Sequence, residues 1–537
     1  MRRWIGDGHL RVGCRPLLLW VLAGLLSAGA ARAGGDPPPG RPLVGDAFYP
    51  PLSAAKDAGE SWDGPMGAGF WDGSEFLVGD VGVVVILVES DGTIDPSREN
   101  WTAEEEEWVT AQVGEAMEWW RRRLSPDLLS FTLEFHYRVL VPYEPITRPQ
   151  PEEALWIESA LDALHQADHD RFTGTQRLVN DFRERGGLDW AFALYVVDSS
   201  EDEDGMFPDG HFAYSYVGGP FAVLTLDNDG WGMENFASVC AHEMGHIFYA
   251  LDQYYAAHVP CDRPSGYLCR ETENSQYGDC PEEVPNCIMR SCRLVSATLS
   301  STARGQVGWG DEDGDSIPDV LDTAPSVRFS GRAAEDGLHY GVARATALPN
   351  RNPSGYGHAI TINRIERVAY RWDGGPWIDA EPSDGEWGGQ SEEFRLSLLA
   401  AAGSAGKVQI RAWNQVGNRT DPPFSLDISL PAGSGAMEGK AHSPSPVRLL
   451  GNRPNPFNPA TEIRLGADAA TPGVLGRVYD ARGSLVRLLW SGDLPAGETV
   501  LLWDGRDEAG RAVASGRYFF RLTAPGMSEV TPLTLVR

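Results

Sequence analysis

The pattern of apolar and polar residues predicts alternating strands and helices in the first half of this chain. Residues 81–89 (VGVVVILVE) are almost continuously apolar, as in a strand buried on both faces. Thr102 and Glu105 form a capping box, after which Val109 and Val113 recur at helical spacing. Further strands are expected at 129–141, 190–197 and 221–226, and further helices near 153–165, near 175–185 and from Met233. This order predicts a mixed α/β domain.

The second half of the chain has an all-β pattern. Residues 324–431 contain strand-like segments separated by Gly, Pro and Asp turns, which predicts a β-sandwich. Residues 432–446 (AGSGAMEGKAHSPSP) have the composition of a linker. Residues 447–537 again place short strands roughly every 8–12 residues. Two β-sandwiches are therefore expected after the α/β domain.

The N-terminal segment has a different character. A basic start leads into the apolar residues 17–26 and then into small residues at 31–33. This is the pattern of a secretory signal peptide over residues 1–33, and its apolar run is too short to span a bilayer. We therefore expect a secreted, extracellular or cell-surface protein without a transmembrane segment in its mature chain. Residues 34–75, rich in Gly, Pro and Ala, are interpreted as a leader or short propeptide.

Length and charge narrow the class of protein. A chain of 537 residues corresponds to about three folded units. It carries 76 acidic and 45 basic residues, for a net charge of −31. Without the signal peptide, 75 acidic and 40 basic residues remain, for a net charge of −35. A nucleic-acid partner is not expected, because such proteins present a basic surface.

The cysteines gather in one stretch. Six of the seven fall between residues 240 and 292. An even number of clustered cysteines in an exported chain predicts disulfides, with 15 pairings open to three bridges. A zinc–thiolate site is the alternative, but the chain has no CxxC pair. The six are Cys240, Cys261, Cys269, Cys280, Cys287 and Cys292.

The strongest chemical signal is the run HEMGH at residues 242–246. Residues four apart share one face of a helix, so His242 and His246 can bind the same zinc ion. Glu243 stands beside the first ligand and can act as the general base toward a water molecule. The alternative is a helix with two surface histidines.

A catalytic zinc ion needs a third protein ligand. Asp252, six residues after His246, is the first candidate. On a continuous helix it would lie on nearly the opposite face, so it can bind only if the helix breaks around residues 249–251. If the helix continues, the third ligand comes from elsewhere. The remaining candidates are then His258, Glu271 and Glu273.

At this point the segment HEMGHIFYALDQYY resembles the metzincin metallopeptidases, whose long motif is HExxHxxGxxH, with Asp as the last ligand in some members. Residues 287–290 (CIMR) resemble the Met-turn of that family, which places Met289 beneath the metal. The segment is also similar to secreted bacterial metallopeptidases related to the immunoglobulin-A-cleaving type. The resemblance covers about residues 76–300. It departs at Tyr249, where the family has Gly.

The resemblance implies an α/β zincin catalytic domain over residues 76–310 and a secreted zinc endopeptidase activity on proteins or peptides. His242, His246 and Asp252 would hold the zinc ion, and Glu243 would move the proton. Two other functions remain open. One is a catalytically inactive zincin fold that serves as a surface-binding or adhesive protein. The other is a zinc hydrolase acting on a non-peptide amide.

An acidic run follows the proposed catalytic domain. Residues 311–322 (DEDGDSIPDVLD) place carboxylates at relative positions 1, 3, 5, 9 and 12. That spacing can wrap oxygens around Ca²⁺, and it resembles a thrombospondin type 3 calcium repeat. The alternative is an acidic linker. A structural calcium loop is expected over 311–323, with the ligands Asp311, Asp313, Asp315, Asp319 and Asp322.

Four short motifs mark the last 90 or so residues: NRPNPFNP at 452–459, VYDARG at 478–483, WDG at 503–505 and SGRY at 515–518. Together they resemble the C-terminal Ig-like module of flagellar-hook-capping type, and they are similar to type IX secretion sorting domains. The resemblance implies contact with the cell surface or the secretion machinery. Residues 366–417 resemble a second Ig-type repeat.

Overall fold

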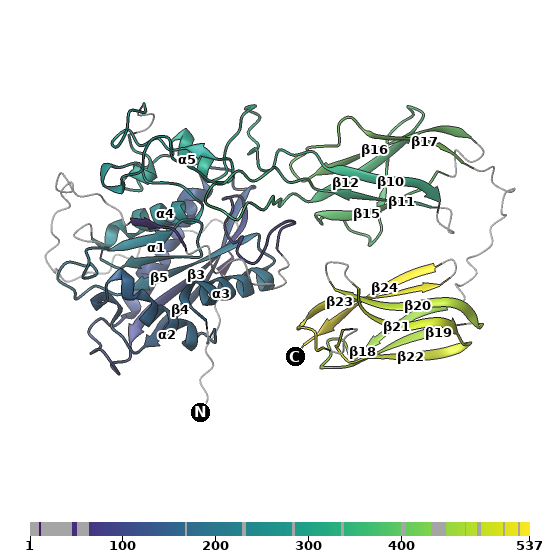
Figure 1. Ribbon diagram of the computed structural model, residues 1–537, viewed down its shortest axis with the longest axis horizontal. Helices are drawn as coiled ribbons and strands as arrows, with labels where there is room; N and C mark the ends of the chain where they lie inside the picture. The colour runs from purple at the N-terminus through teal and green to yellow at the C-terminus, as the bar shows by residue number, and fades with distance from the viewer. Residues whose placement is uncertain are drawn as a thin grey trace, which may run out of the picture. The chain divides into compact units, whose positions relative to one another are not determined.

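The computed structural model describes residues 10–11, 46–50, 64–166, 169–227, 232–281, 285–290, 292–333, 338–398, 404–430, 447–467, 469–480, 485–507, 511–524 and 527–536. The protein is multidomain and predominantly β. Two compact units are formed by Met1–Thr323 with Ala347–Ile362, and by Ala324–Thr346 with Asn363–Arg537 (Figure 1). The linker and, apart from Leu10–Arg11, the signal peptide lie outside the described residues.

The first unit is built on a seven-stranded sheet with the order β1-β4-β3-β5-β7-β6-β2. Strands β4, β3, β5 and β7 run parallel, β6 is antiparallel to β7, and β2 pairs with β6 in parallel. The strands are β1 (Leu10–Arg11), β2 (Asp46–Phe48), β3 (Gly79–Ser90), β4 (Leu129–Val141), β5 (Trp190–Val197), β6 (Ala213–Tyr216) and β7 (Phe221–Thr225). All but β1, β2 and β6 match strands expected from the sequence.

Helices cover both faces of this sheet, with α1 and α4 on one side and α2 and α3 on the other (Figure 1). Successive strand residues point to opposite faces, so Val84 and Ile86 of β3 enter the core shared with Trp156 and Phe172 of α2 and α3. The expected capping box of α1 is present. The helices are α1 (Ala103–Arg121), α2 (Glu153–Ala163), α3 (Arg171–Gly186), α4 (Phe236–Ile247) and α5 (Ser301–Gln306).

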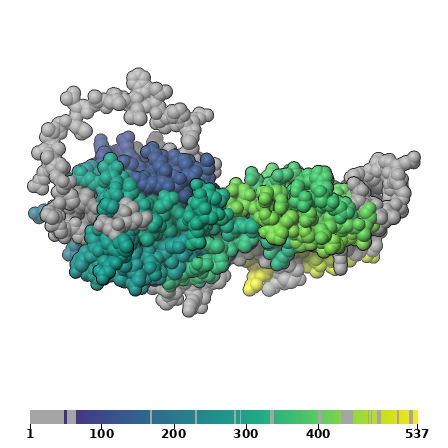
Figure 2. All heavy atoms as spheres, turned by 90° about the horizontal axis from the view of Figure 1, so that it is seen from above, coloured from purple at the N-terminus to yellow at the C-terminus, as the bar shows by residue number. Residues whose placement is uncertain are grey.

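Shorter elements complete the first unit, most of whose described atoms are coloured blue to teal in Figure 2. They are the strands β8 (Pro264–Ser265) and β9 (Arg270–Glu271), and the 3-10 helices η2 (Pro145–Thr147), η3 (Gln150–Glu152), η4 (Met233–Asn235), η5 (Tyr255–Ala257) and η6 (Ile288–Arg290).

Two segments assigned elsewhere from the sequence pack within the first unit. Residues 64–75, expected to be leader, include the buried carboxyl groups of Asp72 and Glu75. Residues 347–362, expected in the first β-sandwich, belong to the first unit, where the backbone N–H of Ile360 donates to the Tyr267 hydroxyl at 2.9 Å. The pattern of apolar residues did not predict that these irregular segments pack in the first unit, because polar contacts hold much of each segment.

Residues of the second unit from 324 to 430 form two facing sheets, with the orders β10-β11-β15-β14 and β13-β12-β16-β17. Inward residues such as Phe394, Val368 and Ile410 share one core, as in a β-sandwich. The strands are β10 (Ser326–Ala333), β11 (His339–Arg344), β12 (Ile365–Trp372), β13 (Ile378–Asp379), β14 (Glu381–Pro382), β15 (Ser391–Leu396), β16 (Ala405–Asn414) and β17 (Phe424–Ser429).

The C-terminal module also has two sheets, with the orders β18-β19-β22 and β21-β20-β23-β24. Its core gathers around Trp503 and Phe520, which are both fully buried. The strands are β18 (Val447–Arg453), β19 (Thr461–Ala467), β20 (Thr471–Asp480), β21 (Leu485–Leu494), β22 (Gly497–Trp503), β23 (Gly516–Ala524) and β24 (Met527–Leu535).

Candidate metal centre

Helix α4 carries the HEMGH run and is buried along its whole length. The indole N–H of Trp120, on α1, donates to the carbonyl of Ala241 at 2.9 Å. The Ser238 hydroxyl accepts the backbone N–H of Leu294 at 2.8 Å. Contacts on several sides therefore fix the position of α4 and of the side chains that it presents.

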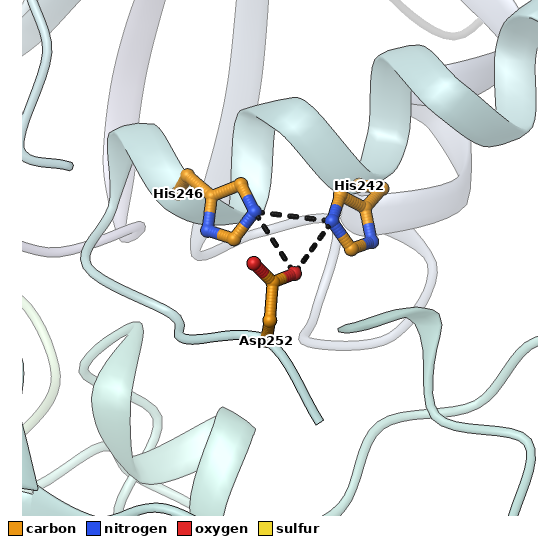
Figure 3. A group of neighbouring side chains, drawn as sticks. All are labelled: His242, His246 and Asp252. Atoms are coloured by element: carbon orange, nitrogen blue, oxygen red, sulfur yellow. Dashed lines mark hydrogen bonds and ion pairs between the residues drawn. The ribbon is translucent and has the colours of Figure 1, made fainter. Parts of the chain in front are cut away.

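Three side chains converge beside α4 (Figure 3). The Nε2 atoms of His242 and His246 are 3.0 Å apart, and Oδ1 of Asp252 lies 3.0 and 3.2 Å from them. All three residues are at most 2% exposed. His242 Nδ1 is 2.8 Å from the carbonyl of Ile288, and His246 Nδ1 is 2.8 Å from that of Ala250. Protons on both Nδ1 atoms leave both Nε2 lone pairs facing the Asp252 carboxylate.

Such a convergence of acceptors is unfavourable unless a positive charge lies between them. Zinc bonds of 2.0–2.2 Å in a tetrahedron would separate the ligand atoms by about 3.3–3.6 Å, a few tenths of an ångström wider than the spacing seen here. The donor set of two imidazoles and a carboxylate also suits zinc and leaves a fourth position for a water or substrate. The residues present therefore fit a zinc ion.

The electrostatics of the cluster also favour a positive charge beside Asp252. For His246, burial lowers the pKa, but the carboxylate of Asp252 outweighs it and raises the pKa to about 9. For Asp252, burial raises the pKa, but the two imidazoles hold it well below its usual range. The cluster thus favours an anionic carboxylate with a cation beside it.

The turn after α4 brings Asp252 back to the histidines. The helix ends with Tyr249 in the left-handed region, at φ 68°. The N–H of Ala250 donates to the carbonyl of Gly245, and the N–H of Tyr249 donates to that of His246, both at 2.9 Å. This pair of bonds forms the Schellman motif that ends many helices. The residue in the left-handed conformation of that motif, here Tyr249, is usually glycine. The sequence condition for Asp252 as third ligand, a break at residues 249–251, is therefore met.

Contacts of the tyrosine ring offset the strain of this turn. Tyr249 is buried, and its hydroxyl forms a hydrogen bond with the carboxyl group of Glu75. Burial, with the charge of Asp72 beside it, raises the pKa of Glu75 to about 8. The ring leaves no room for a side chain at Gly218, where a Cβ atom would lie 2.6 Å from the tyrosine oxygen.

Met289 lies directly against α4. It is fully buried on η6. A Cβ atom added at Gly245 would be 2.5 Å from its sulfur. Its carbonyl accepts the N–H of Gln253 at 2.8 Å, so the same short helix also holds the chain next to Asp252.

Glu243 points to the sheet and contacts Ser215 of β6. The serine hydroxyl donates to Oε2 of Glu243 at 2.6 Å, whereas the buried Oε1 has no hydrogen-bond partner. Burial raises the pKa of Glu243, and the charges of His242 and His246 oppose that rise. The side chain therefore has one oxygen fixed and one available to accept a proton.

Ser215 is a site residue that sequence reasoning missed. It belongs to the four-residue strand β6, Ala-Tyr-Ser-Tyr, which has neither the length nor the apolar run that marks the other strands. Tyr254 is buried, with its ring centroid 6.5 Å from that of His242.

The other candidate ligands lie apart from the centre. Among the described residues, only two sets bring three ligand atoms within 4.8 Å of one another, and neither contains His258, Glu271 or Glu273. His258 packs against the rings of Tyr255 and Tyr277 instead. Asp252 is thus the third residue that this structure brings to the histidines.

The second such set belongs to the acidic loop. Asp311, Asp313 and Asp315 come together and are exposed. Asp319 Oδ1 instead accepts the N–H of Glu312 at 3.0 Å. Asp322 does not belong to the set, so three of the five expected calcium ligands are gathered in this structure.

The cysteines form fewer disulfides than the three expected from the sequence. Cys261 and Cys280 form one bridge. Cys240, Cys269, Cys287 and Cys292 are free thiols. Cys240 is fully buried inside α4, away from the loop that holds the bridge, so clustering in the sequence did not imply pairing in space.

The all-β C-terminal module can be assigned to a class. Its two sheets define a β-sandwich, and residues 457–527 match the family model described as FlgD Ig-like domain. The resemblance of this module to the Ig-like module of flagellar-hook-capping type is confirmed over these residues. No curated protein matches the chain. None of the described helices has the length and apolar character needed to cross a membrane.

Similar solved structures include latent dimeric PorU from Porphyromonas gingivalis, with 16% identity and a TM-score of 0.20, over 41% of this chain and 21% of that one. PorZ, described as a surface component of the type IX secretion system of the same organism, has 15% identity and a TM-score of 0.13, over 37% of this chain and 29% of that one. The D00-D0 domain of intimin has 11% identity and a TM-score of 0.14, over 40% and 100%. These likenesses are too slight to assign a property to this chain.

Proposed function

We propose that the chain is a secreted zinc-dependent endopeptidase of metzincin-like, zincin fold, with its catalytic centre at His242, His246 and Asp252. The observation that carries the proposal is the convergence of two imidazole nitrogens and one carboxylate oxygen at 3.0–3.2 Å. Zinc bound there would supply Lewis acidity toward a water molecule and the scissile carbonyl. The remaining chemistry belongs to residues of the chain.

Glu243 is the proposed general base. Its Oε1 is free to take a proton from the attacking water, while the Ser215 hydroxyl holds Oε2 in place. A carboxyl group whose pKa is raised by burial can accept that proton and return it to the leaving amine. Met289 and the turn at Tyr249 position the ligands and do not touch the reacting atoms.

The burial of the centre favours a second candidate function. Glu243 and His246 have no solvent exposure, so a peptide can reach them only after part of the surrounding chain moves or is removed. In an inactive zincin fold that binds surfaces, the same centre would serve stability alone. The intact pair of Glu243 and its serine partner supports the peptidase.

The proposal is tested with the zinc-loaded full chain and Glu243→Gln. Loss of a positioned general base is expected to lower the rate of casein digestion by about 10²–10⁴-fold. The matched control is Glu107→Gln, an exposed change on α1. Both variants should keep one zinc ion and the wild-type melting temperature. Equal digestion by wild type and Glu243→Gln at equal zinc content would reject the peptidase and leave the binding protein.

We also propose that Asp311, Asp313 and Asp315 hold a structural calcium ion, with Asp319 and Asp322 as further ligands. The support is the gathering of the first three carboxylates and their spacing in the sequence. The C-terminal FlgD Ig-like module, together with the proposed signal peptide, supports a role at the bacterial cell surface or in secretion. Neither β-sandwich contributes to the proposed chemistry.

A further inference from the structure

The peptide unit that joins Ala250 to Leu251 lies between the metal centre and α5. Its carbonyl group, that of Ala250, is 2.8 Å from Nδ1 of His246. Its N–H group, that of Leu251, donates to Oε1 of Gln306 at 3.0 Å. A peptide unit is planar, so these two groups cannot rotate independently. One end of the unit thus meets a proposed zinc ligand, and the other end meets Gln306.

The side-chain amide of Gln306 is buried and held in one orientation. Gln306 is the last residue of α5 and has no solvent exposure. Its Nε2 atom donates to the carbonyl of Arg270 at 3.2 Å and to Oγ1 of Thr272 at 3.0 Å. These two acceptors occupy both N–H groups of the amide and leave its oxygen for the N–H of Leu251. Gln306 therefore offers this backbone segment a fixed acceptor.

The opposite end of α5 holds the other neighbour of Asp252. The Nε2 atom of Gln253 donates to Oγ of Ser300, the N-cap residue of α5, at 2.9 Å. Residues 250–253 belong to no helix or strand, so their polar groups need partners from elsewhere in the chain. The residues on both sides of Asp252 are thus bonded to the two ends of one helix.

We propose that Gln306 is a positioning residue of the zinc centre, which holds the peptide unit 250–251 and through it both His246 and Asp252. A ligating histidine takes its tautomer and ring orientation from the partner of its other nitrogen. For His246 that partner is the Ala250 carbonyl, which Gln306 fixes through the opposite end of the same peptide unit. Any rotation of this unit would also displace Asp252, two residues further along the chain from Ala250.

This inference rests on the zinc site of the proposed function and does not require peptide hydrolysis. Gln306 acts through the backbone of Ala250 and Leu251. An inactive zincin fold that binds zinc would depend on Gln306 in the same way. The measurement that tests it is therefore zinc affinity and not the rate of digestion.

The first variant is Gln306→Met, which removes the amide and keeps a similar volume. In the full chain, competition with a chromophoric chelator should show zinc binding weakened by about 10–100-fold. The visible absorption spectrum of the cobalt-substituted protein should change as well, because it reports the arrangement of the ligands. The melting temperature of the metal-free variant should fall, since the buried N–H of Leu251 loses its partner.

A second variant separates positioning from stability. Gln306→Glu keeps an oxygen for the N–H of Leu251 and loses the N–H groups that reach Arg270 and Thr272. It should melt no higher than Gln306→Met, because it buries a carboxyl group. Its zinc affinity and cobalt spectrum should nevertheless stay close to those of wild type. Gln306→Asn keeps the amide but withdraws it by one methylene, and it should lose zinc affinity even if Gln306→Met does not fold.

The control is Ile157→Val on α2, in the core on the other face of the sheet. It should lower the melting temperature and leave zinc binding unaltered. A wild-type chain that binds no zinc would reject the proposed function and this inference together. If wild type binds zinc and Gln306→Met and Gln306→Asn bind it equally well, the inference alone is overturned. It is also overturned if zinc affinity follows the melting temperature across the variants, with Gln306→Glu as weak as Gln306→Met.

Discussion

Two sets of three ligand side chains in the first unit differ in burial and in what their polar atoms contact. His242, His246 and Asp252 are buried, and their ligand atoms face one another. Asp311 and its two neighbours are exposed. Oδ1 of Asp311 accepts the N–H groups of Gly314 and Asp315 at 2.9 and 3.2 Å. Water and the local backbone therefore satisfy the exposed set, whereas the buried set is satisfied only by a proton or a metal.

This contrast shows that a bound cation should stabilise the two sets by different amounts, although the ligand atoms of each set lie similarly close together. In the buried set, the fold has already met the cost of desolvating and orienting the ligands, so a cation there should add much to stability. In the exposed set, water competes for the same oxygens, and a cation adds less.

The largest expected effect follows removal of zinc. At zinc concentrations near 1,000 times Kd, binding stabilises the folded state by about 4 kcal/mol. Stripping the metal with a chelator should lower the melting temperature of the first unit, measured by calorimetry, and leave the transition of the second unit unchanged. Asp252→Asn should reproduce this loss in the presence of zinc. If the melting transition of the first unit is unaltered after verified metal removal, then metal binding by this buried set does not contribute to the stability of the fold.

The burial of Glu75 should also make the stability of the protein depend on pH. The folded-state pKa of Glu75, about 8, lies above its ordinary value of 4.5. The stability that this group contributes is present below pH 4.5 and is lost as the pH rises through about 8. Between about pH 5 and 7.5, the free energy of unfolding should fall by about 3 kcal/mol. Urea unfolding across this range measures it. Glu75→Gln should flatten the profile, and an equally steep profile in that variant would assign the effect elsewhere.

A smaller loss is expected when the contact beneath the buried set is crowded. In Gly245→Ala, the new Cβ atom meets the Met289 sulfur at 2.5 Å, which should cost about 2 kcal/mol and weaken zinc binding. The matched control is Gly114→Ala on α1, where a Cβ atom meets nothing within 4 Å and should stabilise the helix by about 0.5–1 kcal/mol. Denaturant unfolding measures both. In a double-mutant cycle with Met289→Ala, the two changes together should cost less than the sum of their separate costs, and strict additivity would assign the strain to another contact.

How much of this site the sequence could predict depends on the range of each interaction. The ligands His242 and His246 follow from helix periodicity, which is local. Asp252 required a break that local rules disfavour, because Tyr249 is a poor residue for positive φ. The hydroxyl partner of Tyr249 is Glu75, far away in the chain and within a segment expected to be leader. No local pattern encodes that contact.

The same distinction explains the fold. Long buried strands such as β3 and β5 can be predicted from their continuous apolar runs, and both were expected from the sequence. Strand β6 is short and mixes tyrosine with serine, so only its pairing with β7 and β2 defines it. Ser215 could not be linked to Glu243 without that pairing. Likewise, six clustered cysteines indicate disulfides in general, but the pairing depends on where the folded chain carries each one.

The smallest expected effect tests the exposed set directly. Asp313→Asn removes one carboxylate, as Asp252→Asn does in the buried set, so the pair forms a matched comparison. In calcium-free solution, Asp313→Asn should change the free energy of unfolding by less than about 0.5 kcal/mol, because the side chain is exposed and leaves no buried atom unpaired. With calcium, it should lose whatever stabilisation the ion gives to wild type, measured as the calcium-dependent shift in melting temperature. If Asp313→Asn instead destabilises the calcium-free protein as strongly as Asp252→Asn destabilises the zinc form, then burial does not separate the two sets. The acidic loop would then be preorganised by the fold and not by its ion.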